Sequence, residues 1–129
     1  MIVDASAVFL ALVGAPDKPF RNEQLLAPDL IVAEVLNAIW KVRRAGVPAP
    51  EVTDALSFID KIDLVQSRQL ADRAVELARE LDHPIYDCMY LALADRLDAS
   101  LLTGDARLIR KLGRHPIATS VRLISATGA

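Results

Sequence analysis

Short apolar runs alternate along the chain with longer segments in which apolar residues recur at helical spacing. The short runs are residues 1–3, 62–65, 99–102 and 121–124, and mainly apolar, β-favouring runs of this length predict β-strands. No hairpin turn signal joins one run to the next. Strands that are separated by helices favour an α/β fold with a parallel sheet covered by helices on both faces.

The predicted helices have recognisable start and stop residues. The longest, residues 28–44, is followed by Gly46 and then a proline, the usual order at the end of a helix. Pro16 and Pro19 are typical of a turn, and residues 20–26 after them are predicted as a short helix. The other expected helices span residues 5–13, 51–60, 67–81, 84–97 and 105–113.

Length and composition narrow the class of protein. A chain of 129 residues that is 53% hydrophobic and 25% charged has the size of one domain, so we expect a single domain over residues 1–129. The longest apolar run, residues 7–13, is far shorter than a membrane-spanning helix, which indicates a soluble, cytoplasmic protein without membrane association. With one cysteine and two histidines, the chain lacks the ligands of a thiolate or histidine-rich metal site. Any metal ion would therefore be bound by oxygen.

The small net charge of −2 conceals an uneven distribution. Residues 50–100 contain eleven acids and five bases, whereas residues 101–129 contain one acid and five bases. The basic C-terminal part, which includes Arg107, Arg110 and Arg114, is compatible with a rim that binds a polyanion. A solvated helix face explains the same charges.

Two acids follow predicted strands directly. Asp4 ends the first strand, and Asp105 comes shortly after the strand at residues 99–102. Ligands of open parallel sheets bind outside the carboxyl ends of the strands, where such residues lie. Each aspartate is also suited to be the N-cap of the helix that follows it, which is the alternative explanation.

Two further acids lie in helices that are otherwise apolar. Glu34 lies in a helix whose remaining polar residues, Asn37, Lys41 and Arg44, form one narrow stripe with it. A carboxylate in apolar surroundings is costly unless it is paired or coordinated, although a solvated polar stripe is the simpler explanation. Asp87 lies in the first turn of a helix, where the helix dipole alone favours an acid.

Asp4, Glu34, Asp87 and Asp105 are each isolated in an apolar segment, whereas other helices carry their acids in clusters. Isolated acids are candidates for a shared pocket. If the four converge, a divalent cation must offset their mutual repulsion, and oxygen ligands favour Mg²⁺ or Mn²⁺. The natural chemistry of such a pocket is phosphoryl or phosphodiester chemistry.

These residues resemble those of a known family, the PIN-domain proteins, and specifically the toxin ribonucleases (VapC-type) of bacterial VapBC toxin–antitoxin pairs. The resemblance covers nearly the whole chain, and its pieces appear in the order of the family. They are Val3-Asp4-Ala5-Ser6-Ala7, the helix from Pro28 to Trp40 with Glu34 and Asn37, residues 86–94 around Asp87, and residues 102–108 around Asp105.

The resemblance implies a three-layer α/β/α domain with a short central parallel sheet. It further implies that Asp4, Glu34, Asp87 and Asp105 bind one or two Mg²⁺ or Mn²⁺ ions for endonucleolytic cleavage of RNA. In similar proteins the residues at positions Ser6, Asn37 and Thr103 lie around the acids, where hydroxyl and amide groups orient carboxylates and water.

Two kinds of protein partner also follow from the resemblance. The family implies a homodimer through the early helices, and a cognate antitoxin that blocks the site with a C-terminal peptide. The apolar side chains that would suit such contacts, and that core packing explains equally well, are Val8, Leu12, Ile39 and Trp40.

Three side chains near the acids allow more than one interpretation. Cys88 stands where a small residue is commoner, and we interpret it as a buried, inert cysteine rather than an oxidation-sensitive one. Tyr86 and Tyr90 could stack on a base, but packing in the core or in a dimer is the preferred explanation.

Other functions account for the sequence less well. Haloacid-dehalogenase-like phosphatases place a second aspartate where this chain has Ser6, and receiver-like domains need an adjacent pair of acids that is absent here. The serious alternative is a catalytically silent PIN-like module that binds an antitoxin or another protein. The presence of all four acids argues against it.

Overall fold

The computed structural model describes residues 1–14, 20 and 23–124 of the chain. Five strands form one sheet in the order β3-β2-β1-β4-β5, and every neighbouring pair is parallel. The strands are β1 (Ile2–Val3), β2 (Leu25–Pro28), β3 (Ile62–Val65), β4 (Leu101–Thr103) and β5 (Val121–Leu123). The predicted α/β fold with a parallel sheet is confirmed.

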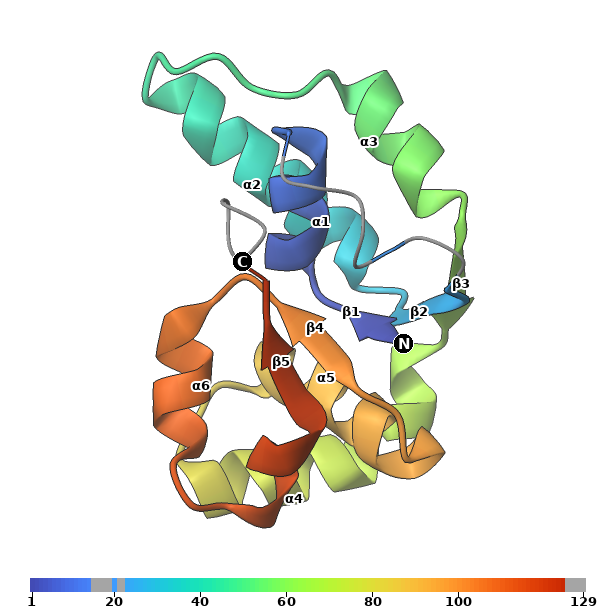
Figure 1. Ribbon diagram of the computed structural model, residues 1–129, viewed down its shortest axis with the longest axis vertical. Helices are drawn as coiled ribbons and strands as arrows, with labels where there is room; N and C mark the ends of the chain where they lie inside the picture. Colours follow the sequence, from blue (N-terminus) through green and yellow to red (C-terminus); the bar gives the residue numbers. More distant parts are fainter. Residues whose placement is uncertain (15–19, 21–22, 125–129) are drawn as a thin grey trace.

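Six α-helices in the described residues surround this sheet. They are α1 (Ala5–Leu12), α2 (Ile31–Arg44), α3 (Val52–Ile59), α4 (Ala71–Leu81), α5 (Ile85–Leu97) and α6 (Ala106–Leu112), with 3₁₀ turns at Ser67–Leu70 and Pro116–Ser120. Figure 1 shows α1, α2 and α3 gathered in one half of the molecule and α4, α5 and α6 in the other. The sheet lies between the two groups, which gives the expected three layers.

The order of the strands places a switch point in the middle of the sheet. From β1 the chain moves outward through β2 to β3, and then returns to the other side of β1 to form β4 and β5. The connections after β1 and after β4 therefore diverge, with α1 following β1 and α6 following β4. A crevice at the carboxyl ends of β1 and β4 is the usual binding position in such a sheet.

The short helix predicted over residues 20–26 was wrong at its end, because the apolar run that begins at Leu25 is the strand β2, while residues 21 and 22 lie outside the described residues. Periodicity alone does not separate a short apolar strand from a piece of helix. In the structure this run lies between β1 and β3, with three of its four residues buried. Consequently α2 begins at Ile31 and not at Pro28. The turn predicted at Pro16 and Pro19 lies outside the described residues.

The core packs directly beneath the carboxyl ends of the central strands. Ile2 and Val3 in β1 and Leu101 in β4 are fully buried. These strands therefore have helices on both faces, which explains why both are apolar up to Val3 and Leu102. Among the helices described, none is long and apolar enough to cross a membrane.

Candidate functional site

Asp4 is held at the carboxyl end of β1 by its role as the N-cap of α1. Its Oδ1 accepts a hydrogen bond of 2.9 Å from the backbone N–H of Ala7 and one of 2.6 Å from the Ser6 hydroxyl. Burial raises the pKa of Asp4 from 3.8 to about 6, because these hydrogen bonds do not offset the loss of solvation and the nearby Asp87 carboxylate adds repulsion. Above neutral pH the Asp4 carboxylate is therefore ionised in a buried position that disfavours its negative charge.

The register between β1 and β4 brings a second group of polar residues next to Asp4. Val3 pairs with Leu102, so Thr103 lies beside Asp4, and its hydroxyl oxygen is 3.2 Å from that of Ser6. The N–H of Gly104 donates to the Ser6 hydroxyl oxygen at 2.8 Å. A Cβ on residue 104 would lie 2.6 Å from Leu10 and 3.3 Å from the Ser6 carbonyl oxygen, so glycine permits this close approach.

Asp105 occupies the equivalent position after β4. Its Oδ1 accepts hydrogen bonds from the N–H groups of Arg107 (2.9 Å) and Leu108 (3.4 Å), so it is the N-cap of α6. The N-cap explanation considered for Asp4 and Asp105 is thus correct for both. It does not exclude a ligand role, because each N-cap uses only one carboxylate oxygen.

Glu34 projects from the first turn of α2 and is bound by a tyrosine of α5. The hydroxyl of Tyr90, which is 1% exposed, donates a hydrogen bond of 2.6 Å to Glu34 Oε1. Burial raises the pKa of Glu34, the Tyr90 hydrogen bond lowers it, and repulsion from Asp87 and Asp4 raises it further. Burial and the Glu34 carboxylate also raise the pKa of Tyr90, so this tyrosine remains a donor.

We expect Tyr90→Phe to lower the free energy of unfolding by about 1–2 kcal/mol, because a partly buried hydrogen bond to a carboxylate is lost. The pKa of Glu34 should rise further, since that hydrogen bond stabilises the charged form. Urea unfolding and ¹³C NMR titration of the Glu34 carboxyl group in EDTA measure both effects. Tyr86→Phe is the matched control, because Tyr86 is exposed. Equal behaviour of the two variants would contradict this role for Tyr90.

Asp87 lies in the first turn of α5, and the ring of His83 is bound to it. His83 Nε2 is 2.6 Å from Asp87 Oδ2. Because α5 ends shortly before β4 begins, its first turn lies at the carboxyl ends of the strands. The neighbouring Cys88 is fully buried, and burial raises the pKa of its thiol to about 11. A buried thiol that stays protonated agrees with the interpretation of Cys88 as inert.

These acids line one small cavity of about 150 Å³ at the carboxyl ends of the central strands. The residues that line it are Asp4, Ala5, Ser6, Glu34, Asp87, Tyr90 and Asp105. All of its charged residues are acidic. In the hydrogen bonds formed by the described residues, Glu34, Asp87 and Asp105 each use one carboxylate oxygen and leave the other without a donor.

The donor set of this cavity fits a hard divalent cation. No described side-chain oxygen is both fully buried and unpaired, and the buried Asp4 lines the cavity. Among the described residues, no group of three or more acids, histidines or cysteines is arranged closely enough to hold a metal ion by itself. Mg²⁺ retains several water ligands and commonly needs only one or two carboxylates, so an open arrangement of this kind is compatible with it.

A second cavity, of about 490 Å³, differs in its electrostatics. It lies between α4, α5 and the turn at Pro116–Ser120, and its acids are paired with bases. Arg73 lies 2.9 Å from Glu76 and 3.0 Å from Asp95, and His115 lies 2.7 Å from Glu80. Each acid of this cavity lies within 4 Å of a basic side chain, whereas no basic side chain lines the acidic cavity.

Several sequence predictions concern residues outside the acidic cavity. Asn37 lines an adjacent groove instead. Arg107, Arg110 and Arg114 are exposed on and after α6 and do not line the cavity. Of the apolar side chains considered for partner contacts, Val8 and Ile39 are buried in the core, while Trp40 is 53% exposed.

The sequence analysis missed the contact of His83 with Asp87. It interpreted Tyr90 as a packing residue, and the structure shows it buried but also hydrogen-bonded to Glu34. Tyr90 lies three residues after Asp87 in α5, a spacing that places both on one helix face. That spacing was available as a signal for Tyr90, but its contact with Glu34 spans 56 positions and depends on where the tertiary fold places α2 relative to α5.

The comparisons with known proteins agree with this architecture. The model of the PIN domain family matches residues 1–114. The chain is 36% identical over 119 residues to Ribonuclease VapC1 of Mycobacterium tuberculosis, covering 83% of this chain and 86% of that protein. It is 30% identical over 126 residues to Ribonuclease VapC3 of Pyrobaculum aerophilum, covering 86% and 93%.

Two solved structures have a similar fold. A crystal structure from Pyrobaculum aerophilum has a TM-score of 0.69 at 24% identity, covering 85% of this chain and 77% of that one. A toxin–antitoxin complex from Klebsiella pneumoniae has a TM-score of 0.67 at 15% identity, covering 94% of both chains. The family match spans all four acids and most of the chain, and the relatives named above are ribonucleases of the VapC type. The chain belongs to the PIN-domain family.

Proposed function

We propose that residues 1–129 form a single ribonuclease domain, a metal-dependent endoribonuclease that is the toxin of a type II toxin–antitoxin pair. The observation that carries the proposal is the acidic cavity, in which acids from four separate segments meet without a base. The similarity to two VapC ribonucleases supports RNA as the substrate. The likeness of the fold to a toxin–antitoxin complex is compatible with an antitoxin partner.

Asp4, Glu34, Asp87 and Asp105 are the residues that would hold one or two Mg²⁺ or Mn²⁺ ions. When bound, such an ion neutralises charge on the phosphate and lowers the pKa of the attacking water. The protein holds the carboxylates in position through Ser6, Ala7, Tyr90 and the first turn of α6. Thr103 acts through Ser6, to whose hydroxyl it is adjacent.

The wider surface suggests how substrate and partners bind. Exposed Arg107, Arg110 and Arg114 follow Asp105 and would attract the RNA backbone. An antitoxin would block the acidic cavity by offering it a basic side chain. We also propose a homodimer, to which the exposed Trp40 would contribute, and a cytoplasmic location, where cellular RNA is accessible.

The test is cleavage of total cellular RNA by antitoxin-free protein, with Mg²⁺, Mn²⁺ or EDTA, followed by sequencing of the cut ends. We expect discrete internal cuts that require the metal and disappear in Asp105→Asn. Asparagine still caps α6, so the fold should survive the change. Asp63→Asn, a change at an exposed acid of β3, serves as the control and should cut like the wild type.

Two results would contradict the proposal. Cleavage by Asp105→Asn at the wild-type rate would remove that residue from the site. Absence of any cleavage by folded protein in the presence of Mn²⁺ would favour the catalytically silent binding module, in which the acids serve as a docking position for a partner.

A further inference from the structure

Three of the four acids in the acidic cavity are anchored by well-fixed parts of the fold, and Asp87 is the exception. Asp4 and Asp105 accept hydrogen bonds from backbone N–H groups of the helices that they cap. Glu34 accepts one from the hydroxyl of Tyr90, whose side chain is buried. Asp87 therefore needs a separate explanation for how its carboxylate is held.

The sequence at the start of α5 rules out a backbone anchor of the usual kind for Asp87. Asp87 is the third residue of α5, a position from which an acid can bond back to the N–H of the N-cap residue. The N-cap is Pro84, which has no N–H. In the part of the chain that the structure describes, the one donor to Asp87 is the ring of His83, whose Nε2 lies 2.6 Å from Oδ2. An ionised carboxylate only accepts, so Nε2 is the donor.

The main chain of His83 is itself fixed, independently of the ring. Its N–H donates to the carbonyl oxygen of Ala78 at 3.1 Å, where α4 ends. Pro84 restricts the backbone of the residue that precedes it. The ring therefore starts from a defined position, and its side chain is only 19% exposed. Since these backbone contacts do not involve the imidazole, a substitution of His83 should leave them in place.

Stabilisation of the fold does not account for the contact between His83 and Asp87. The helix dipole favours acids at the start of α5, but it gives no advantage to a base there. Partly exposed ion pairs contribute little to stability. The contact does engage Oδ2 of a residue that lines the acidic cavity, so Oδ1 is the oxygen left for a cation.

We propose that His83 is a positioning residue of the metal site, whose Nε2–H holds the Asp87 carboxylate in one orientation, with Oδ1 ready to bind the cation. The inference rests on the proposed function, which supplies the cation. His83 does not line the cavity, so it acts through Asp87 and not on the RNA. Loss of a hydrogen bond that orients a metal ligand typically weakens metal binding about 10–100-fold.

Calorimetric titration of the antitoxin-free protein with Mn²⁺ tests this role without any cleavage. We expect His83→Ala to raise the Kd for Mn²⁺ about tenfold or more. In His83→Gln the amide nitrogen can occupy the position of Nε2, so the Kd should stay within about threefold of the wild type. The amide of His83→Asn is too short to reach Asp87, so this variant should behave like His83→Ala.

The second histidine of the chain is a matched control. The side chain of His115 is also 19% exposed, and its Nε2 lies 2.7 Å from a carboxylate oxygen of Glu80. Neither residue lines the acidic cavity. His115→Ala therefore removes an equivalent contact elsewhere in the fold, and the Kd for Mn²⁺ should not change.

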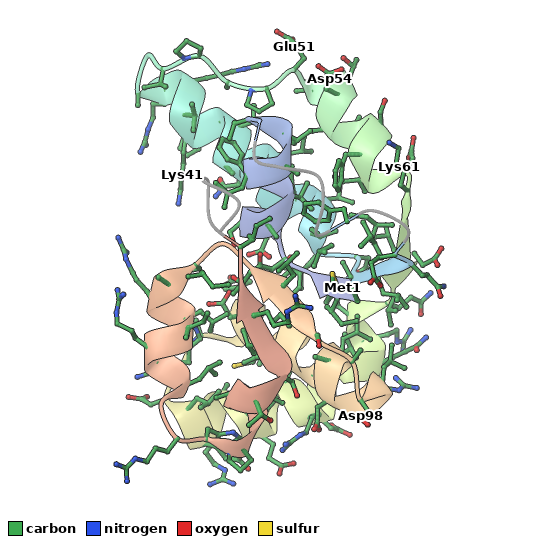
Figure 2. All side chains as sticks on the ribbon, in the orientation of Figure 1. Met1, Lys41, Glu51, Asp54, Lys61 and Asp98 are labelled. Atoms are coloured by element: carbon green, nitrogen blue, oxygen red, sulfur yellow. The ribbon has the colours of Figure 1, made fainter. Side chains whose placement is uncertain are left out.

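A double-mutant cycle tests whether His83 acts through Asp87. Asp87→Asn should weaken Mn²⁺ binding, and adding His83→Ala to it should change the Kd less than about twofold, because the group that His83 positions is already lost. Asp98, labelled in Figure 2, is the C-cap at the other end of α5 and has a φ of 50°. Asparagine tolerates this conformation, so Asp98→Asn should fold and bind Mn²⁺ like the wild type.

The orientation of Asp87 is also measurable without metal. In EDTA, NMR side-chain couplings of Asp87 should show one χ1 rotamer in the wild type and in His83→Gln. In His83→Ala they should show an average over several rotamers, because nothing else in the described structure anchors the carboxylate. A single rotamer in His83→Ala would overturn the inference.

The remaining outcomes separate this inference from the proposed function. If the wild type cleaves RNA but His83→Ala binds Mn²⁺ equally well, or His83→Gln binds it no better than His83→Asn, the inference is overturned and the ribonuclease remains. Saturating Mn²⁺ should restore cleavage by His83→Ala to within about threefold of the wild type. A loss that excess Mn²⁺ does not restore would mean that His83 acts on the RNA, which also overturns the inference. If Mn²⁺ affinity depends on His83 but no RNA is cut, the proposed function alone fails.

Discussion

Asp4→Asn is expected to reduce RNA cleavage by about a thousandfold or more while stabilising the metal-free protein above pH 7. Asparagine keeps an acceptor oxygen for Ser6 and for the N–H of Ala7, so α1 keeps its N-cap. The negative charge that would bind the metal ion is lost. Removal of a group that acts as part of one catalytic unit typically has an effect of this size.

The gain in stability follows from the raised pKa of Asp4. Burial raises that pKa from 3.8 to about 6, so between these values the folded state binds more protons than the unfolded state. Stability is therefore lost as the pH rises through this interval, by an amount on the order of 3 kcal/mol above pH 7. The asparagine of the variant does not ionise and avoids the loss, and the raised pKa already includes the favourable contact of the charge with the first turn of α1. A gain on the order of 2–3 kcal/mol at pH 8 is therefore expected.

Urea unfolding in EDTA at pH 4.5 and pH 8 measures this difference. Asp4→Asn should exceed the wild type at pH 8 and lose most of that advantage at pH 4.5. Asp60→Asn, which changes an exposed acid at the end of α3, should match the wild type at both pH values. A variant that is less stable than the wild type at pH 8 would show that the Asp4 charge is already compensated without metal.

Mn²⁺ is expected to stabilise the wild-type protein at pH 8, by about 2.7 kcal/mol when its concentration is 100 times the dissociation constant. The reason is that a bound cation offsets the repulsion and burial that raise the pKa values of Asp4 and Glu34. Protons compete for the same oxygens. With a pKa of about 6 for Asp4, the apparent dissociation constant should increase about tenfold at pH 5.

Thermal unfolding with increasing Mn²⁺, together with calorimetric titration, measures this effect. Asp60→Asn should respond like the wild type, and Asp4→Asn should respond much less. Equal stabilisation of all three proteins would place the binding elsewhere on the surface. No stabilisation at any pH would contradict the assignment of the acidic cavity as a metal site.

Most of the fold could be predicted from the sequence because its signals are local. Asp4 and Asp105 cap helices through N–H groups only two or three residues away. The end of α2 just before Gly46 and the alternation of apolar runs with helices are likewise signals from residues that are close together in the chain. The run that begins at Leu25 was misassigned because its short apolar pattern suits a strand and a helix equally, and only its position between β1 and β3 decides.

The sequence by itself determined the parallel α/β fold and which acids are isolated in apolar segments. Only the tertiary structure decided that these acids line one cavity, because the pairing of Val3 with Leu102 and the hydrogen bond from Tyr90 to Glu34 join residues far apart in the chain. It also decided that Tyr90 is a buried donor while Tyr86 is exposed. Both tyrosines lie in one helix and have the same chemistry, but the elements packed around each ring differ.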